Sequence, residues 1–369
     1  MSEAIANRYY PDEVSPPGET LREALEERGM TQAELAVRMN RPEKTLSEIV
    51  RGKAALTPDT AIQLELALGI PADFWLARES RYRENLSRRQ QENDLGKQGE
   101  WAARFPTRKM IQYGWIDKQK NKNSEVRELL GFFNVASAAG WTELYSVTRA
   151  RFRKSRKFEC DSAALAAWLQ QGWREATSVQ CEAFSRDVFR RCLLEIRPLT
   201  REQRPEVLVS QLQETCRRAG VAVVFVPELP GARVSGTTRW MTSSKALIQL
   251  SLRYKTNDHL WFTFFHEAGH ILLHKKREIF LEANGGDSKD ELEANRFAAD
   301  MLIPPDEYKE FVAGGVTSKE QVREFAARVD IADGVVVGRL QRDKIIPHHS
   351  FNALKVRYEW VAAEKDPPG

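Results

Sequence analysis

The sequence predicts a multidomain, mainly α-helical protein: an all-α N-terminal domain, a helical middle region and an α+β C-terminal domain. Three observations support this prediction. Short amphipathic segments broken by turn residues fill residues 1–82, helical periodicity continues through 83–204, and two β-type runs precede two helices within 205–369. Because helices and strands are segregated along the chain, we expect separate domains with these boundaries.

Composition places the chain among ordinary globular proteins. It has 369 residues, 42% hydrophobic and 29% charged, which argues against general disorder. The longest apolar run, 219–226, is too short to span a bilayer, and no basic-then-apolar signal begins the chain. We therefore expect a cytoplasmic protein with no membrane partner. Reduced thiols are expected at the four cysteines, which show no CxxC spacing: Cys160, Cys181, Cys192 and Cys216.

The segment 18–52 contains three short amphipathic helices separated by turn residues. Thr31 can cap the middle helix, and Glu34 can complete a capping box with it. Asn40 marks a tight turn, after which the third helix begins at Pro42. Two helices joined in this way form a helix-turn-helix.

The third of these helices presents polar side chains opposite its apolar face. Those side chains would enter a major groove, and two flanking residues are placed for phosphate contacts. Residues 1–80 carry 9 basic against 14 acidic residues, whereas 38–53 carry five against two, so positive charge is concentrated where DNA would lie. A helical docking domain that binds no DNA is the alternative. The candidate DNA-binding residues are Gln32, Lys44, Thr45, Ser47, Glu48, Arg51 and Lys53.

The pentapeptide His266-Glu267-Ala268-Gly269-His270 places two imidazoles one helical turn apart with a carboxylate beside them. Positions i and i+4 lie on one helix face about 6 Å apart along the axis, so both rings can reach one metal ion. Glu267 is rotated off that face, which suits a general base. This spacing is typical of zinc-dependent hydrolases. Apolar flanks predict a buried helix, where these polar groups need a partner such as zinc. Histidines satisfied within a structural core are the alternative.

A second helix, ended by a Pro-Pro pair, should supply the third ligand. Glu291 and Asn295 form an i,i+4 polar pair on it, in which Glu291 can ligate and Asn295 can hold a ligating histidine from behind. Glu293 points about 200° away from Glu291 on an ideal helix and competes for the ligand role. The residues expected to pack this helix inward are Leu292, Ala294, Ala298 and either Met301 or Leu302.

His274 shares the helix face of the two motif histidines. It lies about 12 Å along the helix from His266, which is too far for both to ligate one ion through bonds of about 2.1 Å. We interpret His274 as a residue beside or behind the ligands.

Two β-type runs, 221–226 and 245–254, precede the pentapeptide. The second alternates apolar with polar residues, which predicts a half-buried strand. Helix, strands, motif helix and glutamate-bearing helix together form an α+β order found in metallopeptidases. An edge strand beside such a site can bind an extended peptide by main-chain pairing, and 245–254 is the candidate.

The middle region shows no motif that indicates chemistry. Residues 83–95 are polar and charged and predict a helix extension or linker. Six of the nine residues in 149–157 are basic, which we interpret as a solvated loop, with contact to DNA phosphates or an acidic partner as the alternative. We expect a helical connector.

The N-terminal segment resembles the lambda-repressor-like helix-turn-helix and, within it, the HigA type of antitoxin. The resemblance implies an XRE-type DNA-binding domain that dimerises on palindromic operators, with double-stranded operator DNA as its partner. The stretches that carry it are 17–21, 31–36, 45–49, 52–53, 56–61 and 67–76.

From about residue 205 the chain resembles the ImmA/IrrE family of zinc peptidases, through 266–274 and 291–304. The family's ligand glutamate falls three residues before an Ala-Asn pair, which matches Glu291 and leaves Glu293 as its neighbour. The resemblance implies a zincin-like metallopeptidase fold and a Zn²⁺ cofactor. The implied ligands are His266, His270 and Glu291, and the implied general base is Glu267.

The sequence therefore predicts a DNA-binding transcriptional regulator fused to a zinc-dependent endopeptidase. We expect an antitoxin or repressor of a toxin-antitoxin or mobile-element locus, acting as a homodimer with a cognate toxin or a repressor protein as its protein partner. The alternative is a non-catalytic antitoxin whose C-terminal domain binds and neutralises a toxin, with a structural or sensory metal site.

Overall fold

The structure is a computed structural model that describes residues 14–145, 161–276, 280–281 and 288–360. The chain folds as two compact units, Met1–Gly99 and Glu100–Gly369. The predicted boundary at 82/83 lies inside one helix, Ala72–Gly96. The two units meet after the end of that helix, at 99/100. The finer division at 204/205 stays a prediction.

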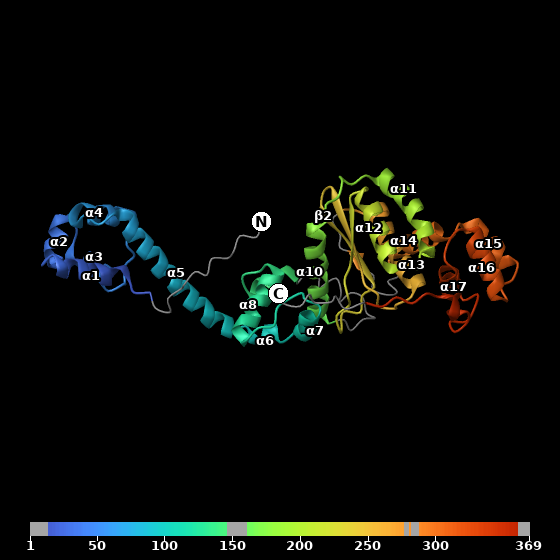
Figure 1. Ribbon diagram of the computed structural model, residues 1–369, viewed down its shortest axis with the longest axis horizontal. Helices are drawn as coiled ribbons and strands as arrows, with labels where there is room; N and C mark the ends of the chain where they lie inside the picture. The colour runs from blue at the N-terminus through green and yellow to red at the C-terminus, as the bar shows by residue number, and fades with distance from the viewer. Residues whose placement is uncertain (1–13, 146–160, 277–279, 282–287, 361–369) are drawn as a thin grey trace. The chain divides into compact units, whose positions relative to one another are not determined.

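The described part of the N-terminal unit, from residue 14 onward, is all α-helical (Figure 1). The capping box expected at Thr31 is present, because its side chain accepts from the Glu34 N–H while Glu34 accepts from the Thr31 N–H at 2.8 Å. Residues 83–95 form a helix extension. The helices are α1 (Pro17–Glu27), α2 (Gln32–Arg38), α3 (Glu43–Val50), α4 (Pro58–Leu68) and α5 (Ala72–Gly96).

The core of this unit holds α3 firmly in place. Leu35 of α2, Leu46 of α3 and Trp75 of α5 are fully buried in one cluster. Gly18 of α1 lies against the α3 backbone, since a Cβ at this position would come within 2.4 Å of the Ile49 carbonyl oxygen. Any larger residue at position 18 would therefore push α1 off α3.

The C-terminal unit combines a small sheet with many helices (Figure 1). Its described helices include α6 (Gly99–Ala102), α7 (Thr107–Gln112), α8 (Lys122–Phe133), α10 (Ser162–Ser178), α11 (Arg186–Ile196), α12 (Pro205–Arg217), α13 (Asn257–Leu273), α14 (Lys289–Leu302), α15 (Pro305–Ala313), α16 (Lys319–Arg328) and α17 (Asp333–Arg342). Short 3₁₀ helices cover η1 (Arg197–Arg201) and η2 (Asn352–Leu354), and the strands are β1 (Val221–Phe225), β2 (Gly236–Thr242), β3 (Lys245–Leu250) and β4 (Phe280–Leu281).

The sheet has the strand order β1-β3-β2-β4. β3 pairs in parallel with β1 and antiparallel with β2, and β2 pairs antiparallel with β4. The prediction that 245–254 forms an edge strand open to a peptide is therefore wrong: β3 ends at Leu250 and has a neighbour on each side. The reason is β2, an unpredicted strand that pairs with the side of β3 left open by β1.

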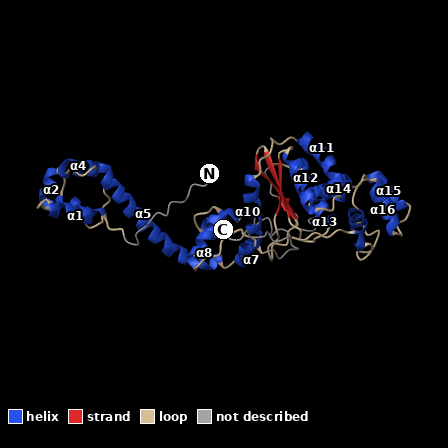
Figure 2. Cartoon of the chain, viewed as in Figure 1, coloured by secondary structure: helices blue, strands red, loops and turns tan. Residues whose placement is uncertain are grey.

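Helices cover both faces of the sheet, and Figure 2 shows the strands between α10 and α12. Ile248 and Leu250 of β3 face the main core, which also contains residues of α11, α12 and α13. Gln249 faces α10, where its Nε2 donates to the Trp168 carbonyl at 2.7 Å and Gly172 makes room for its amide. The polar alternation of β3 thus marks a face covered by a helix. The region predicted to be a connector therefore supplies one layer of the sheet domain.

α13 is the central helix of this unit and is packed closely by two others. A Cβ on Gly269 would lie 3.3 Å from Cα of Ala294, so α13 and α14 are in near-backbone contact. Gly334 and Gly338 allow the same approach from α17, since a Cβ on Gly338 would lie 2.6 Å from that of Asp258. Close packing of this kind gives the side chains of the three helices fixed relative positions.

α14 presents small residues to α13. Ala294, Ala298 and Leu302 are buried, as predicted, but the prediction that Leu292 packs inward is wrong, because its side chain is 58% exposed. Residues two positions apart in sequence point about 200° apart around a helix, so Leu292 and Ala294 cannot face the same neighbour.

Three further sequence predictions concern membrane spans, the basic segment and the cysteines. Among the described residues, no helix is both long enough and apolar enough to cross a bilayer. The basic segment 149–157 lies outside the described residues, as does Cys160. The three described cysteines, Cys181, Cys192 and Cys216, are free thiols.

Candidate metal centre and nucleic-acid interface

The pentapeptide lies in the buried second half of α13. His266, Glu267 and His270 are each at most 1% exposed, and the helix around them is apolar on nearly every face. The helix ends at Leu273, and His274 follows as its C-cap with extended backbone. Burial of three polar side chains in such a helix requires specific partners.

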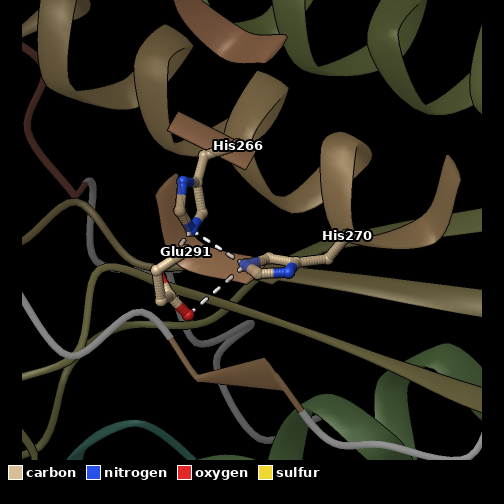
Figure 3. Close-up of side chains that lie close together, drawn as sticks. All are labelled: His266, His270 and Glu291. Atoms are coloured by element: carbon tan, nitrogen blue, oxygen red, sulfur yellow. Dashed lines mark hydrogen bonds and ion pairs between the residues drawn. The ribbon is translucent and has the colours of Figure 1, made fainter. Parts of the chain in front are cut away.

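Two histidines and a glutamate converge on one point, as Figure 3 shows, and we name His266, His270 and Glu291 the inner cluster. The two Nε2 atoms lie 3.0 Å apart, while the Glu291 carboxylate oxygens lie 3.2 Å from His266 Nε2 and 3.5 Å from His270 Nε2. A tetrahedral zinc ion with bonds of about 2.1 Å separates its donor atoms by about 3.4 Å. The donor spacing and donor chemistry therefore fit one divalent metal ion.

A hydrogen bond behind each histidine orients its ring. The Oδ1 of Asn295 lies 3.0 Å from His266 Nδ1. An amide oxygen only accepts, so His266 Nδ1 carries the proton and its Nε2 keeps the lone pair that faces the cluster. His270 Nδ1 lies 2.9 Å from His274 Nδ1. Burial, and then the neighbouring His266 and His274, lower the pKa of His270 to about 2. His270 is therefore neutral near pH 7, the form that binds metal.

Glu267 is placed beside the inner cluster by the sheet as well as by its own helix. A Cβ on Gly236, the first residue of β2, would lie 3.1 Å from both Cγ and Oε1 of Glu267. Glycine at this position therefore makes room for the glutamate side chain. Glu267 is thus a buried carboxylate next to the inner cluster, where a general base could act.

An outer cluster, formed by His274, Asp290 and Glu293, lies next to the inner one. His274 Nε2 is 3.5 Å from a Glu293 oxygen and 3.8 Å from an Asp290 oxygen. Lys289 also pairs with Glu293, at 3.6 Å. Glu293, which the sequence left as a competitor of Glu291, therefore faces His274.

A cavity of about 470 Å³ borders the inner cluster. His266, Glu291 and Asn295 form part of its wall, together with residues from α13, α14, α17 and the chain that follows α17. Glu267 and His270 are absent from the described wall. The cavity therefore reaches the cluster from the side of His266 and Asn295.

The predicted DNA-binding residues lie on and around α3 of the N-terminal unit. Lys44, Arg51 and Lys53 are exposed, and Lys44 is 3.9 Å from the Glu48 carboxylate one turn later. The remaining candidates, Gln32, Thr45, Ser47 and Glu48, are half-buried. Polar and basic side chains therefore occupy the outer face of α3, opposite the buried Leu46 and Ile49.

Three residues near the inner cluster were not predicted from the sequence. Phe262 lines the cavity, and its position four residues before His266 on one helix could have revealed it. Gly236 begins a run of β-branched and aromatic residues that is typical of a strand. Arg342 also lines the cavity, but it lies far along the chain on α17 and has no local signal.

Two parts of the chain match known families. Residues 21–75 match the helix-turn-helix family, and residues 216–341 match the M78 peptidase family described as an IrrE N-terminal-like domain. The two resemblances predicted from the sequence are confirmed at the level of these families. Because one match falls in each compact unit, the chain joins a helix-turn-helix domain to an IrrE-type domain.

Two individual proteins are similar to part of the chain. The chain is 38% identical over 60 residues to the uncharacterized HTH-type transcriptional regulator YddM of Escherichia coli (strain K12); this match spans 16% of the chain and 64% of that protein. A solved structure of an addiction module antidote protein of a HigA family from Coxiella burnetii is 26% identical, with a TM-score of 0.21, over 23% of this chain and 92% of that one.

Proposed function

We propose that this chain, which joins a helix-turn-helix domain to an IrrE-type domain, is a DNA-binding transcriptional regulator with zinc-dependent endopeptidase activity. The observation that carries the proposal is the convergence of His266, His270 and Glu291 beside the buried carboxylate of Glu267. All four residues lie within the part of the chain that matches the IrrE-type family.

In this proposal each residue has a distinct task. Zn²⁺ held by the inner cluster would act as a Lewis acid on the scissile carbonyl and lower the pKa of water. Glu267 accepts a proton from the attacking water and delivers it to the nitrogen of the leaving amine, while the hydroxyl bonds to the carbonyl carbon and the C–N bond breaks. Asn295 and His274 keep the two histidine rings turned towards the metal.

Replacement of Glu267 by Gln tests the endopeptidase. We expect Glu267→Gln to retain zinc, because Glu267 is no ligand in this proposal, and to lose cleavage by a factor of about 100 or more. The measurement is mass-spectrometric mapping of cut sites in a proteome-derived peptide library, with zinc content from elemental analysis. Glu324→Gln, exposed on α16, is the matched control and should cut as the wild type does. Undiminished cleavage by Glu267→Gln would sink the mechanism, as would a zinc-loaded wild type that cuts nothing.

The N-terminal unit would bring this activity to DNA as a homodimer. The exposed outer face of α3 supports major-groove binding of double-stranded operator DNA. Ile62 and Leu66, one turn apart on α4 and 52% and 82% exposed, support contact with a second copy or a protein partner. In the finer proposal that partner is a cognate toxin or a repressor protein, and the protein is an antitoxin or repressor in the cytoplasm.

Two exposed cations directly after α3 test DNA binding. We expect Arg51→Ala and Lys53→Ala each to weaken binding to DNA from upstream of the protein's own gene, and to reduce the slope of log affinity against log salt by about 1 per lost phosphate contact. Fluorescence anisotropy over a salt series measures both. Arg88→Ala is the matched control, because Arg88 lies on α5 beyond the helix-turn-helix match and pairs with Glu84 at 2.7 Å. Equal loss in the control would contradict a specific role for α3.

One observation favours a second candidate function without catalysis. Glu267 is fully buried and is absent from the described wall of the cavity. In this second candidate the metal bound by the inner cluster would be structural or sensory. The protein would be an antitoxin whose C-terminal unit binds and neutralises a toxin. X-ray absorption on the zinc-loaded protein separates the two: a closed shell of four protein ligands favours the second candidate, whereas three protein ligands and one water favour the enzyme.

A further inference from the structure

The 470 Å³ cavity has a buried apolar floor. Leu302 and Ile303 at the end of α14 and Val335 of α17 line it and are each at most 3% exposed, while Ala299 is 9% exposed. Side chains that line a cavity and are nearly buried lie at its bottom rather than at its mouth. The exposed residues of the described wall are all polar or charged: His259, Arg342 and His348.

The apolar floor continues the helix faces that carry the inner cluster. Phe262 lies one turn before His266 on α13, and their rings are 6.2 Å apart. On α14, Glu291, Asn295 and Ala299 follow one another at intervals of four residues and so share one face. Because both faces line the cavity, a molecule bound at the inner cluster adjoins Phe262 and Ala299.

The buried polar residues of the wall lie further from the inner cluster. Asp258 precedes His266 by eight residues, about 12 Å along α13, and its carboxylate accepts from Lys355 Nζ at 2.6 Å. The side-chain oxygen of Gln341 accepts from the same Nζ at 2.8 Å. This ion pair therefore lies at the end of the cavity away from the inner cluster, and the floor between them is mainly apolar.

We propose that this cavity receives a large aliphatic or aromatic side chain of the substrate, from a residue next to the scissile peptide bond. The proposal rests on the proposed endopeptidase function and adds a substrate class to it. Consecutive Cα atoms lie about 3.8 Å apart, so a peptide whose scissile carbonyl lies at the inner cluster can place an adjoining side chain against Phe262 and Ala299. Burial of that side chain removes apolar surface of both partners from water, which favours binding.

Three hydroxamates test the apolar floor by binding alone, since each chelates zinc and none contains a peptide bond to be cut. 4-Methylpentanohydroxamate has an apolar arm, its isostere 4-amino-4-oxobutanohydroxamate has a carboxamide in place of the isopropyl group, and acetohydroxamate has only a methyl group. In calorimetric titration of the zinc-loaded full-length protein, we expect the first to bind about tenfold or more tightly than either of the others, as filling an apolar pocket provides.

Two variants tie this preference to the floor of the cavity. Ala299→Leu fills space beside the inner cluster and Phe262→Ala removes an apolar wall, so each should reduce the preference to about threefold or less. Ala327→Leu, the same change at an exposed position of α16, should keep it. Elemental analysis and circular dichroism check that all variants are loaded with zinc and folded. Equal affinities of the three hydroxamates, absence of binding by all three, or a preference that both cavity variants keep would each overturn the proposal.

Mapping of cut sites in the peptide library connects the cavity to the substrate. The wild type should cut beside large aliphatic or aromatic residues, and Ala299→Leu should shift the cuts towards smaller residues. Cuts by the wild type without any such preference would overturn this proposal and leave the endopeptidase function standing. A wild type that cuts nothing would overturn the endopeptidase function and, with it, a peptide as the occupant of the cavity, whatever the affinities of the hydroxamates.

Discussion

The inner and outer clusters both combine histidine with carboxylate, and they differ in burial. The inner cluster takes two histidines from α13 and Glu291 from the first turn of α14, whereas the outer cluster takes His274 from the C-cap of α13 and two carboxylates from the start of α14. The histidines of the inner cluster are buried and Glu291 is 16% exposed, whereas the outer carboxylates of Asp290 and Glu293 are 48% and 44% exposed. Residue type and spacing alone therefore do not distinguish a metal site from a surface ion pair.

The positions of the imidazole protons distinguish the two clusters further. If His270 binds metal through Nε2, its Nδ1 carries the proton and donates to His274 Nδ1, 2.9 Å away. His274 then carries its own proton on Nε2, which faces Glu293 and Asp290 rather than a metal. We therefore expect the outer cluster to hold the inner one in place, as a carboxylate behind a ligating histidine does elsewhere.

Removal of one carboxylate from each cluster tests most directly which cluster binds zinc. Glu291→Gln takes a ligand from the inner cluster, and we expect the protein to lose nearly all zinc after dialysis against a chelator. Glu293→Gln, two residues away on α14, is the matched control and should keep about one zinc per chain. Elemental analysis of both variants measures this. A wild type with two zinc ions, one of them lost in Glu293→Gln, would show that the outer cluster is a second metal site.

A smaller effect is expected from His274→Ala, which removes the link between the clusters. His270 then loses the partner of its Nδ1, and we expect zinc affinity to fall about 10- to 100-fold, the usual cost of losing such a partner. Competition with a chromogenic chelator gives the dissociation constant. His348→Ala, exposed at the cavity and outside both clusters, should leave zinc affinity unchanged. Unchanged affinity in His274→Ala would contradict the supporting role of the outer cluster.

Local patterns were sufficient to predict the helices that carry the site. The i,i+4 spacing of His266 and His270, and of Glu291 and Asn295, fixes which side chains share a helix face whatever the rest of the fold does. The capping box at Thr31 is equally local, because all its atoms lie within one helical turn. Such features depend on neighbouring residues only, so a sequence is enough to find them.

Features that depend on distant residues could not be predicted in the same way. The polar face of β3 indicated exposure, but α10, some 80 residues earlier, supplies Gly172 and the Trp168 carbonyl that let Gln249 be buried. β2 was missed, and with it the true position of β3 within the sheet. The cavity wall likewise joins α13 to α17, and no local pattern pairs Phe262 with Arg342.

The smallest effect we predict concerns pH and the burial of the inner cluster in metal-free protein. His270 keeps a pKa of about 2 when folded, below the ordinary value of 6.5, so below pH 6.5 the unfolded chain binds a proton that the folded chain does not. Stability should therefore fall as the pH drops below 6.5, by about 1.4 kcal/mol per pH unit.

Urea unfolding of chelator-treated protein at pH 7.5 and 5.5 measures this, and tryptophan fluorescence reports the C-terminal unit, where eight of the nine tryptophans lie. His270→Gln should lose this part of the pH dependence. If the free energy of unfolding changes equally with pH in the variant and the wild type, burial of His270 does not control this pH dependence. The inner cluster would then be more open to water than its packing on α13 and α14 implies.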